Sequence, residues 1–362
     1  MFFSSAKFKE QTDSDETKGI FSQERRRNFT ATIVPSPDAN DTRRDGLKGD
    51  AFVPEQSYFS VRLVEMRMSK AGNYLSKYLP MCSCFLSYRY GDSLRHVPYI
   101  AGHQMIRDLL GKDAPADAGR NIEFKDLYIV RDVPVKSDSV TMYTALSRVS
   151  DSSFTRGMLD LFSETVGALG GPALGLAVTT GVDLTKKLGA ILGSDDVSTR
   201  FGMFNGDALT TSGYRIFAGA DLDTTDLEMS NGGLMRTGSD GQPKHIDDAD
   251  YLVIALEHRK TLLDQPFGAL GHLPFHAKWK ETVDKLMAKD PAGANEMVRQ
   301  MAITLKNSPD IVEADKIELL ITYLSQLERW NAVANTLPVF RSGGKKLSGS
   351  LHDIADHLED EG

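Results

Sequence analysis

The sequence predicts an α+β protein with an antiparallel β-sandwich core, an inserted helical hairpin and a C-terminal three-helix bundle. Three observations support this. Short apolar runs with a period of two, bounded by Gly, Asp, Asn and Pro, fill the middle of the chain. Most of them follow one another without an intervening helical pattern, which favours antiparallel over doubly wound parallel sheets. After residue 259 the apolar period becomes helical.

The first 52 residues differ in composition from the rest of the chain. Charged residues occupy 18 of the first 50 positions, and large apolar residues are few. Such a segment buries too little apolar surface to offset the entropy lost on ordering. We therefore expect residues 1–52 to be a disordered or loosely draped arm.

The β-sandwich is expected within residues 53–262. The runs that predict its strands are 58–66, 81–90, 122–130, 140–149, 199–204, 214–220 and 251–258. Cys82 and Cys84 stand two apart in one of these strands, roughly 6 to 7 Å from each other, which is too far for an unstrained disulfide. Two free thiols, and an N-terminus without the apolar run of a signal peptide, favour a cytoplasmic location.

The inserted hairpin is predicted at residues 154–193. Phe154, Met158, Leu161 and Phe162 begin a helical stripe, and glycines and a proline at 170–172 interrupt it before a second helical pattern. We expect this hairpin to cover one face of the sheet. Because residues 165–182 are uncharged, reversible insertion into a membrane is the alternative.

The three-helix bundle is predicted at residues 272–334. Pro274, Pro291 and Pro309 each stand at the expected first turn of a helix, where a missing N–H costs nothing. A flexible linker then begins at residue 342, and Leu351, Ile354 and Leu358 fall on one face of a short acidic segment that ends at residue 362. We expect these three residues to dock on a protein partner; a solubilising acidic tail is the alternative.

No complete catalytic or cofactor motif is present in the sequence. Cys82 or Cys84 with His96 or His103 has the residue types of a nucleophile and base, but no third group orients them. A further pair of histidines, at positions 272 and 276, has the spacing of zinc ligands on a helix, but Pro274 lies between them and no third ligand is near. We expect a structural role for both sets.

Five aspartates suggest a calcium site. Asp132 and Asp138 lie around the end of one predicted strand, and Asp221, Asp223 and Asp226 follow another. If these loops met at one end of the sandwich, their carboxylates could supply the oxygen ligands that calcium needs. Solvated turn aspartates explain the same residues without a metal.

Around these aspartates, about 20 residues resemble the C2 family. The segment 136–139, Lys-Ser-Asp-Ser, looks like the C2 loop that precedes a strand, and the segment 221–223, Asp-Leu-Asp, looks like its paired-aspartate loop. The resemblance implies a β-sandwich that binds calcium and phospholipid through these loops. Ser139 and Val140 stand where the family usually has proline and an aromatic residue.

Together these features predict a non-enzymatic binding or scaffolding protein with a protein partner and no cofactor. A net charge of −8 gives no general attraction to nucleic acid. A membrane-associating protein, acting through calcium loops or the 154–193 hairpin, is the main alternative, and an unrecognised hydrolase is the second. The oligomeric state stays open.

Overall fold

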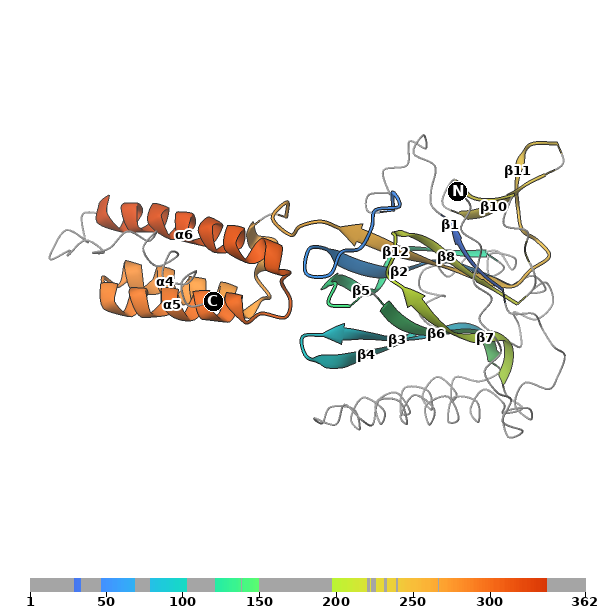
Figure 1. The fold of residues 1–362 in the computed structure, drawn as a ribbon, viewed down its shortest axis with the longest axis horizontal. Coiled ribbons are helices and arrows are strands. Elements are labelled where there is room, and N and C mark those ends of the chain that lie inside the picture. The colour runs from blue at the N-terminus through green and yellow to red at the C-terminus, as the bar shows by residue number, and fades with distance from the viewer. Residues whose placement is uncertain are drawn as a thin grey trace.

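The structure, a computed structural model, shows a two-layer β-sandwich with a helical bundle at one end (Figure 1). It describes residues 29–33, 47–68, 79–102, 121–137, 139–149, 197–219, 222, 226–230, 233–238, 240–265 and 267–336. The predicted 154–193 hairpin and the tail residues Leu351, Ile354 and Leu358 therefore lie outside the described residues.

Three antiparallel sheets form the β part. The five-stranded sheet has the order β1 (Phe29–Ile33), β8 (Gly213–Ala218), β12 (Tyr251–Arg259), β2 (Tyr58–Arg67) and β5 (Asn121–Pro134). The four-stranded sheet has the order β4 (Ser93–Ala101), β3 (Leu79–Tyr90), β6 (Ser139–Val149) and β7 (Val197–Ala208). The small sheet has the order β11 (Pro243–His245), β10 (Gly233–Thr237) and β9 (Leu227–Ser230).

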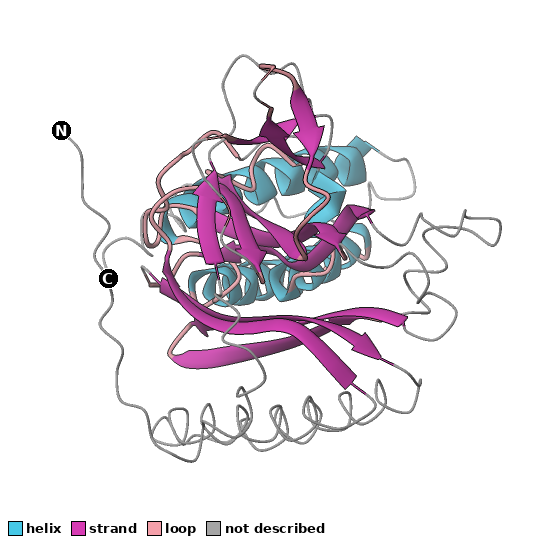
Figure 2. Ribbon diagram, turned by 90° about the vertical axis from the view of Figure 1, so that its right-hand side faces the viewer, coloured by secondary structure: helices cyan, strands magenta, loops and turns pink. Residues whose placement is uncertain are grey.

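Side chains alternate between the two faces of a strand, so the central strands of the five-stranded sheet contribute residues to two different cores. On β12, Leu252 and Ile254 point into the core between the two large sheets, where Cys84 and Leu86 of β3 meet them. The alternate residues of β12 point to the other side and pack under the small sheet. Figure 2 shows the two large sheets as separate layers. This arrangement confirms the predicted α+β class with antiparallel sheets.

All seven predicted strands are present, and the structure adds β1, β4 and the small sheet. β4 has a weak strand pattern because it contains Pro98 and several polar residues. It lies at an edge of its sheet, where a residue without an N–H is tolerated. This edge strand therefore escaped a search for apolar alternation.

The expectation of a disordered arm is wrong for the part of residues 1–52 that the structure describes. β1 pairs with β8 over its whole length, with Ala31 and Ile33 against the core under the small sheet. Leu47 and Phe52 are buried as well. The prediction missed this strand because the average charge of the segment is high, although the five residues Phe-Thr-Ala-Thr-Ile alternate between apolar and polar side chains as a strand should.

Three helices follow β12 and form the bundle: α4 (Pro274–Met287), α5 (Pro291–Lys306) and α6 (Glu313–Thr336), preceded by a 3-10 turn, η2 (Phe267–Leu270). α4 and α5 begin at the predicted prolines, and the Asp290 carboxylate caps α5 by accepting from the Gly293 N–H at 2.9 Å. α6 begins at Glu313, later than the predicted start at Pro309, because Ile311 and Val312 are buried in the bundle core as an irregular turn.

Candidate functional site: the helical bundle and its junction with the sandwich

The junction between the sandwich and the bundle is built around the buried side chains of Tyr58 and Asp315. The Tyr58 hydroxyl donates to Asp315 Oδ2 at 2.9 Å and accepts from the Val312 N–H at 3.1 Å. The Leu262 N–H donates to the same carboxylate oxygen at 2.8 Å. Burial, reinforced by the charge of Asp315, raises the pKa of Tyr58 well above its ordinary value, so the hydroxyl keeps its proton and donates.

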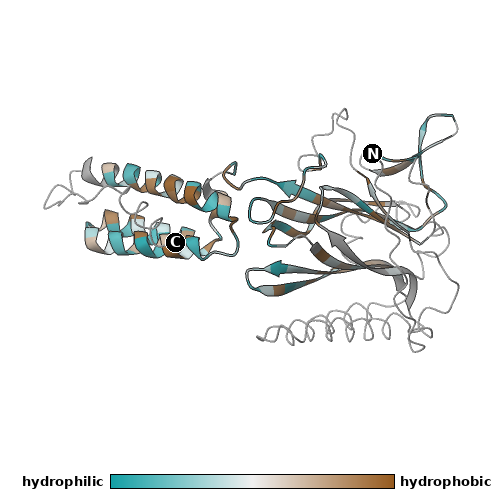
Figure 3. Ribbon diagram, in the orientation of Figure 1, coloured by the Kyte–Doolittle hydropathy of each residue, from teal (hydrophilic) through white to brown (hydrophobic). Residues whose placement is uncertain are grey.

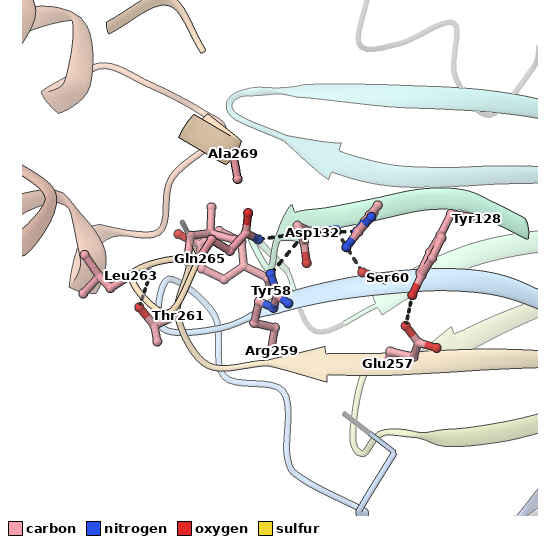
Figure 4. A network of polar contacts seen from close by, with 12 residues as sticks. Tyr58, Ser60, Tyr128, Asp132, Glu257, Arg259, Thr261, Leu263, Gln265 and Ala269 are labelled. Carbon is pink, nitrogen blue, oxygen red and sulfur yellow. Dashed lines mark hydrogen bonds and ion pairs between the residues drawn. The ribbon is translucent and has the colours of Figure 1, made fainter. Parts of the chain in front are cut away.

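Asp132 forms a second polar centre beside this junction (Figure 4). Its backbone has a φ of 51°, and its N–H donates to Ser60 Oγ at 2.9 Å where the β2–β5 register shifts, as in a β-bulge. Its carboxylate lies 3.4 Å from Arg259 Nη1 and accepts from Gln265 Nε2 at 3.2 Å. Asp132 therefore joins β5 to the segment that leads from β12 into the helices.

Two further contacts reach the bundle from other parts of the sandwich. The Tyr90 hydroxyl, at the tip of the β3–β4 hairpin, donates to the Asp310 carboxylate in the turn before α6. Glu55 accepts from the Ala314 N–H through its carbonyl at 3.4 Å, and its carboxylate pairs with Lys136 Nζ at 2.6 Å. Because these connections come from separate parts of the sandwich, the bundle is held in one orientation on it.

The polar network continues along the five-stranded sheet. Arg62 of β2 pairs with Glu257 of β12 at 2.6 Å, and Tyr128 of β5 donates to the same carboxylate at 3.0 Å. Arg131 lies over the Tyr128 ring at 5.1 Å from its centroid. Burial and the charge of Glu257 raise the pKa of Tyr128. These titratable groups have internal partners and stabilise the sheet next to the junction.

The most exposed apolar side chains of the described residues lie on the helices. Ile317 is 56% exposed and Ile321 is 49% exposed. Leu319, Tyr323 and Leu327, on the other side of α6, occupy the bundle core. The sequence of α6 thus has apolar residues over more of its circumference than three helices can cover.

We call this exposed face of α6 the α6 seam. It consists of residues at helical spacings of three and four: Ala314, Ile317, Ile321, Ser325, Glu328 and Ala332. All six are exposed. In Figure 3, apolar and polar residues alternate along α6. A period of this kind is typical of a helix that packs against another helix, in addition to the contacts it makes in its own bundle.

The charges beside the α6 seam are mainly acidic. Glu313 and Glu318 flank the isoleucines on either side, and Glu328 lies within the seam. Lys316 is turned away from it, because its ammonium donates to the Lys306 carbonyl and pairs with Glu313 at 2.8 Å. The seam therefore centres on two isoleucines with acidic residues beside them, while Glu328 and the neighbouring Arg329 make its C-terminal half polar.

The predicted nucleophile and zinc candidates have structural surroundings. Cys82 and Cys84 are free and buried between the sheets, and burial raises the pKa of Cys84 to about 12 and that of Cys82 well above its usual value. His96 hydrogen-bonds Ser87 Oγ at 2.7 Å and stacks on Phe85. His103 lies outside the described residues.

The two histidines with zinc-like spacing have separate partners. His276 is buried, and its Nδ1 is 2.7 Å from the Tyr323 hydroxyl of α6. His272 is exposed, with its Nδ1 3.1 Å from the Ala269 carbonyl oxygen. Within the described residues no three His, Cys, Asp or Glu side chains gather as metal ligands would.

The structure describes only two of the five calcium candidates. Asp132 lies opposite the beginning of β2 and contacts Arg259, whereas Asp226 precedes β9, whose hairpin packs near the end of β2. These two carboxylates are therefore not brought together. Asp138, Asp221 and Asp223 lie outside the described residues, so the five-residue site stays a prediction.

No helix among the described residues is both long enough and apolar enough to cross a bilayer. Comparisons of the chain with protein-family models, with curated proteins and with solved structures found no match. The local resemblance to C2 loops therefore stays a prediction from sequence.

Proposed function

We propose that this protein is a non-enzymatic binding or scaffolding protein that captures an amphipathic helix of a protein partner on the α6 seam. The observation that carries this proposal is the exposure of Ile317 and Ile321 on successive turns of one face of α6. Apolar side chains at this spacing are the contacts that an amphipathic helix makes in helix-to-helix recognition. Fully burying one isoleucine contributes about 1.5 to 3 kcal/mol, so two of them can supply the centre of an interface.

The acidic border of the α6 seam supports a partner helix with basic residues beside its apolar stripe. Glu313 and Glu318 would meet those residues at the rim, and Glu328 would meet one within the seam; charge complementarity of this kind gives specificity and faster association more than affinity. The same carboxylates would disfavour an acidic helix.

The junction supports the scaffolding part of the proposal. Since Tyr58, Asp315 and Asp132 hold the bundle on the sandwich, a partner on α6 would stand in a fixed position relative to both large sheets. A preorganised surface binds more tightly than a mobile one, because less entropy is lost on association. The two buried free thiols support a reducing, cytoplasmic setting for this function.

The test uses one double variant and one matched control. Ile317→Glu with Ile321→Glu places two negative charges on the α6 seam, whereas Ile303→Glu places one negative charge on an isoleucine of α5 that is 52% exposed. Partners are captured from native extract on each protein and identified by mass spectrometry, and the helix responsible is then titrated against the purified proteins. We expect one partner to be lost from the double variant alone. Equal capture by all three proteins would refute the proposal.

A further inference from the structure

A second polar cluster lies under the small sheet, away from the junction and the α6 seam. Glu65 is fully buried, and both of its carboxylate oxygens accept hydrogen bonds: Oε1 from the Tyr251 hydroxyl at 2.6 Å and Oε2 from the Leu234 N–H of β10 at 2.7 Å. Arg67 stands two residues further along β2, on the same side of the strand, and is paired in register with Tyr251. This cluster attaches β10 to the five-stranded sheet.

Arg67 is the unusual member of the cluster. Its side chain is only 9% exposed, and its Nη2 pairs with Asp247 Oδ1. Its Nε is buried and has no hydrogen-bond partner among the described residues. A guanidinium presents its Nε–H and the adjacent Nη2–H along one edge, as a fork that fits two oxygens of one carboxylate or phosphate. Asp247 occupies the Nη2 arm of this fork, the guanidinium also interacts with the Tyr251 side chain, and the Nε arm has no acceptor among the described residues.

The partner of Arg67 is itself poorly enclosed. Asp247 lies between β11 and β12, and its side chain is 81% exposed. The next residue, Asp248, is also exposed and lies 3.5 Å from Arg236 Nη1; the Arg236 side chain is 35% exposed, and its Nε is buried without a partner in the described part of the chain. Exposed aspartates of one segment thus contact both arginines, but only in Arg67 does the unpaired Nε–H lie on the same edge as the nitrogen that the aspartate contacts.

We propose that the free edge of Arg67 is a binding site for a small oxyanion of the phosphate or carboxylate class, which displaces the Asp247 side chain. Two oxygens of one ligand would accept from Nε–H and Nη2–H together, where Asp247 accepts from Nη2–H alone. The buried Nε–H gains the acceptor that it lacks, which is favourable because an unpaired buried donor is costly. Asp247 moves into water, where it already lies for the most part.

Asp247 also sets the affinity. As part of the same chain it competes at a high effective concentration, so a free anion binds weakly to the unaltered protein. Its removal should expose the fork. This site is independent of the proposed partner helix, because Arg67 lies on β2 under the small sheet and the α6 seam lies on the bundle.

The experiment titrates the full chain with inorganic phosphate and, separately, with acetate at constant ionic strength, followed by calorimetry. Asp247→Asn keeps the size of the exposed side chain and should bind phosphate about tenfold more tightly than the unaltered protein, by the loss of the competing charge. Asp240→Asn is the matched control, since it removes one exposed carboxylate from the adjacent hairpin, where Asp240 pairs with Lys244 at 2.7 Å. It should bind as the unaltered protein does.

The two anions distinguish the ligand classes. A gain with phosphate alone assigns the fork to phosphate groups, and an equal gain with acetate assigns it to carboxylates. Adding Arg67→Lys to Asp247→Asn should abolish either gain, because an ammonium group has no fork. The proposal would be overturned if Asp247→Asn and the unaltered protein bound the anions equally well. It would also be overturned if Asp240→Asn showed the same gain in affinity as Asp247→Asn.

Discussion

The Tyr58 hydroxyl and the Asp315 carboxylate are 2.9 Å apart and buried, although 257 positions separate them in the sequence. Tyr58 begins β2 and Asp315 lies in the first turn of α6, so this hydrogen bond directly links the sandwich to the bundle. The same hydroxyl accepts from Val312, immediately before α6. The position of α6 therefore depends on Tyr58 of the β core together with the contacts of Tyr90 and Glu55.

Tyr58→Phe should destabilise the protein by about 1 to 3 kcal/mol, because it leaves the Val312 N–H without its acceptor and the Asp315 carboxylate with one donor fewer. Urea unfolding measures the change. Tyr128→Phe is the control: it removes a hydrogen bond to Glu257 that is only partly buried, so water can replace it and the loss should be smaller. Equal losses of unfolding free energy in the two variants would show that the buried hydrogen bonds of Tyr58 stabilise the protein no more than the partly buried bond of Tyr128.

The variant Asp132→Asn should be more stable than Asp132→Val. Asp132→Asn keeps a side chain type that accepts the φ of 51° and loses only the ion pairs with Arg131 and Arg259. Asp132→Val places a β-branched side chain at positive φ, which adds a cost of order 1 to 3 kcal/mol. Thermal unfolding of both variants separates charge from backbone strain. A valine variant as stable as the asparagine variant would show that the bulge relaxes.

The pair His276 and Tyr323 should make stability depend on pH. Burial, with the nearby charge of Lys280, lowers the pKa of His276, so the folded state binds fewer protons than the unfolded state below the usual histidine pKa of about 6.5. Stability should therefore fall as the pH falls from about 6.5 towards the folded pKa, and should not depend on this residue above that window. His276→Gln should reduce the slope of stability against pH in that window; an unchanged slope would remove His276 as the cause.

Cys82 and Cys84 should be unreactive in the folded protein. Burial raises the pKa of both thiols, so little thiolate forms near pH 8 and neither sulfur is accessible. A thiol reagent should label neither residue in the native state and both in denaturant, as counted by mass spectrometry. Fast labelling of either residue in the native protein would contradict the buried position between the sheets.

The fold was largely predictable because its strands and helices have clear apolar periods. The alternation of β2 and β12 and the prolines before α4 and α5 are local signals, and the structure confirms the elements they predict. β1 was missed because it lies in a segment of high charge, and β4 because it contains Pro98 and several polar residues. The late start of α6 depends on the contact of Val312 with Tyr58, which no local pattern contains.

The candidate site was much less predictable. Ile317 and Ile321 are apolar residues at helical spacing, and the sequence alone does not show which side of α6 the other helices cover. The excess of apolar residues around α6 was the available signal. Arg67 was missed for a similar reason: its burial depends on the small sheet and on Tyr251, both distant in the sequence.

The most direct test of the central proposal is a binding titration of the identified partner helix against three purified proteins. These are the unaltered chain, the double variant Ile317→Glu with Ile321→Glu, and the control Ile303→Glu. All three should unfold at similar denaturant concentrations, because the substituted side chains are exposed. The proposal predicts at least about a hundredfold weaker binding for the double variant, from the loss of about 3 kcal/mol of apolar burial, and normal binding for the control. Unchanged affinity of the double variant would contradict it.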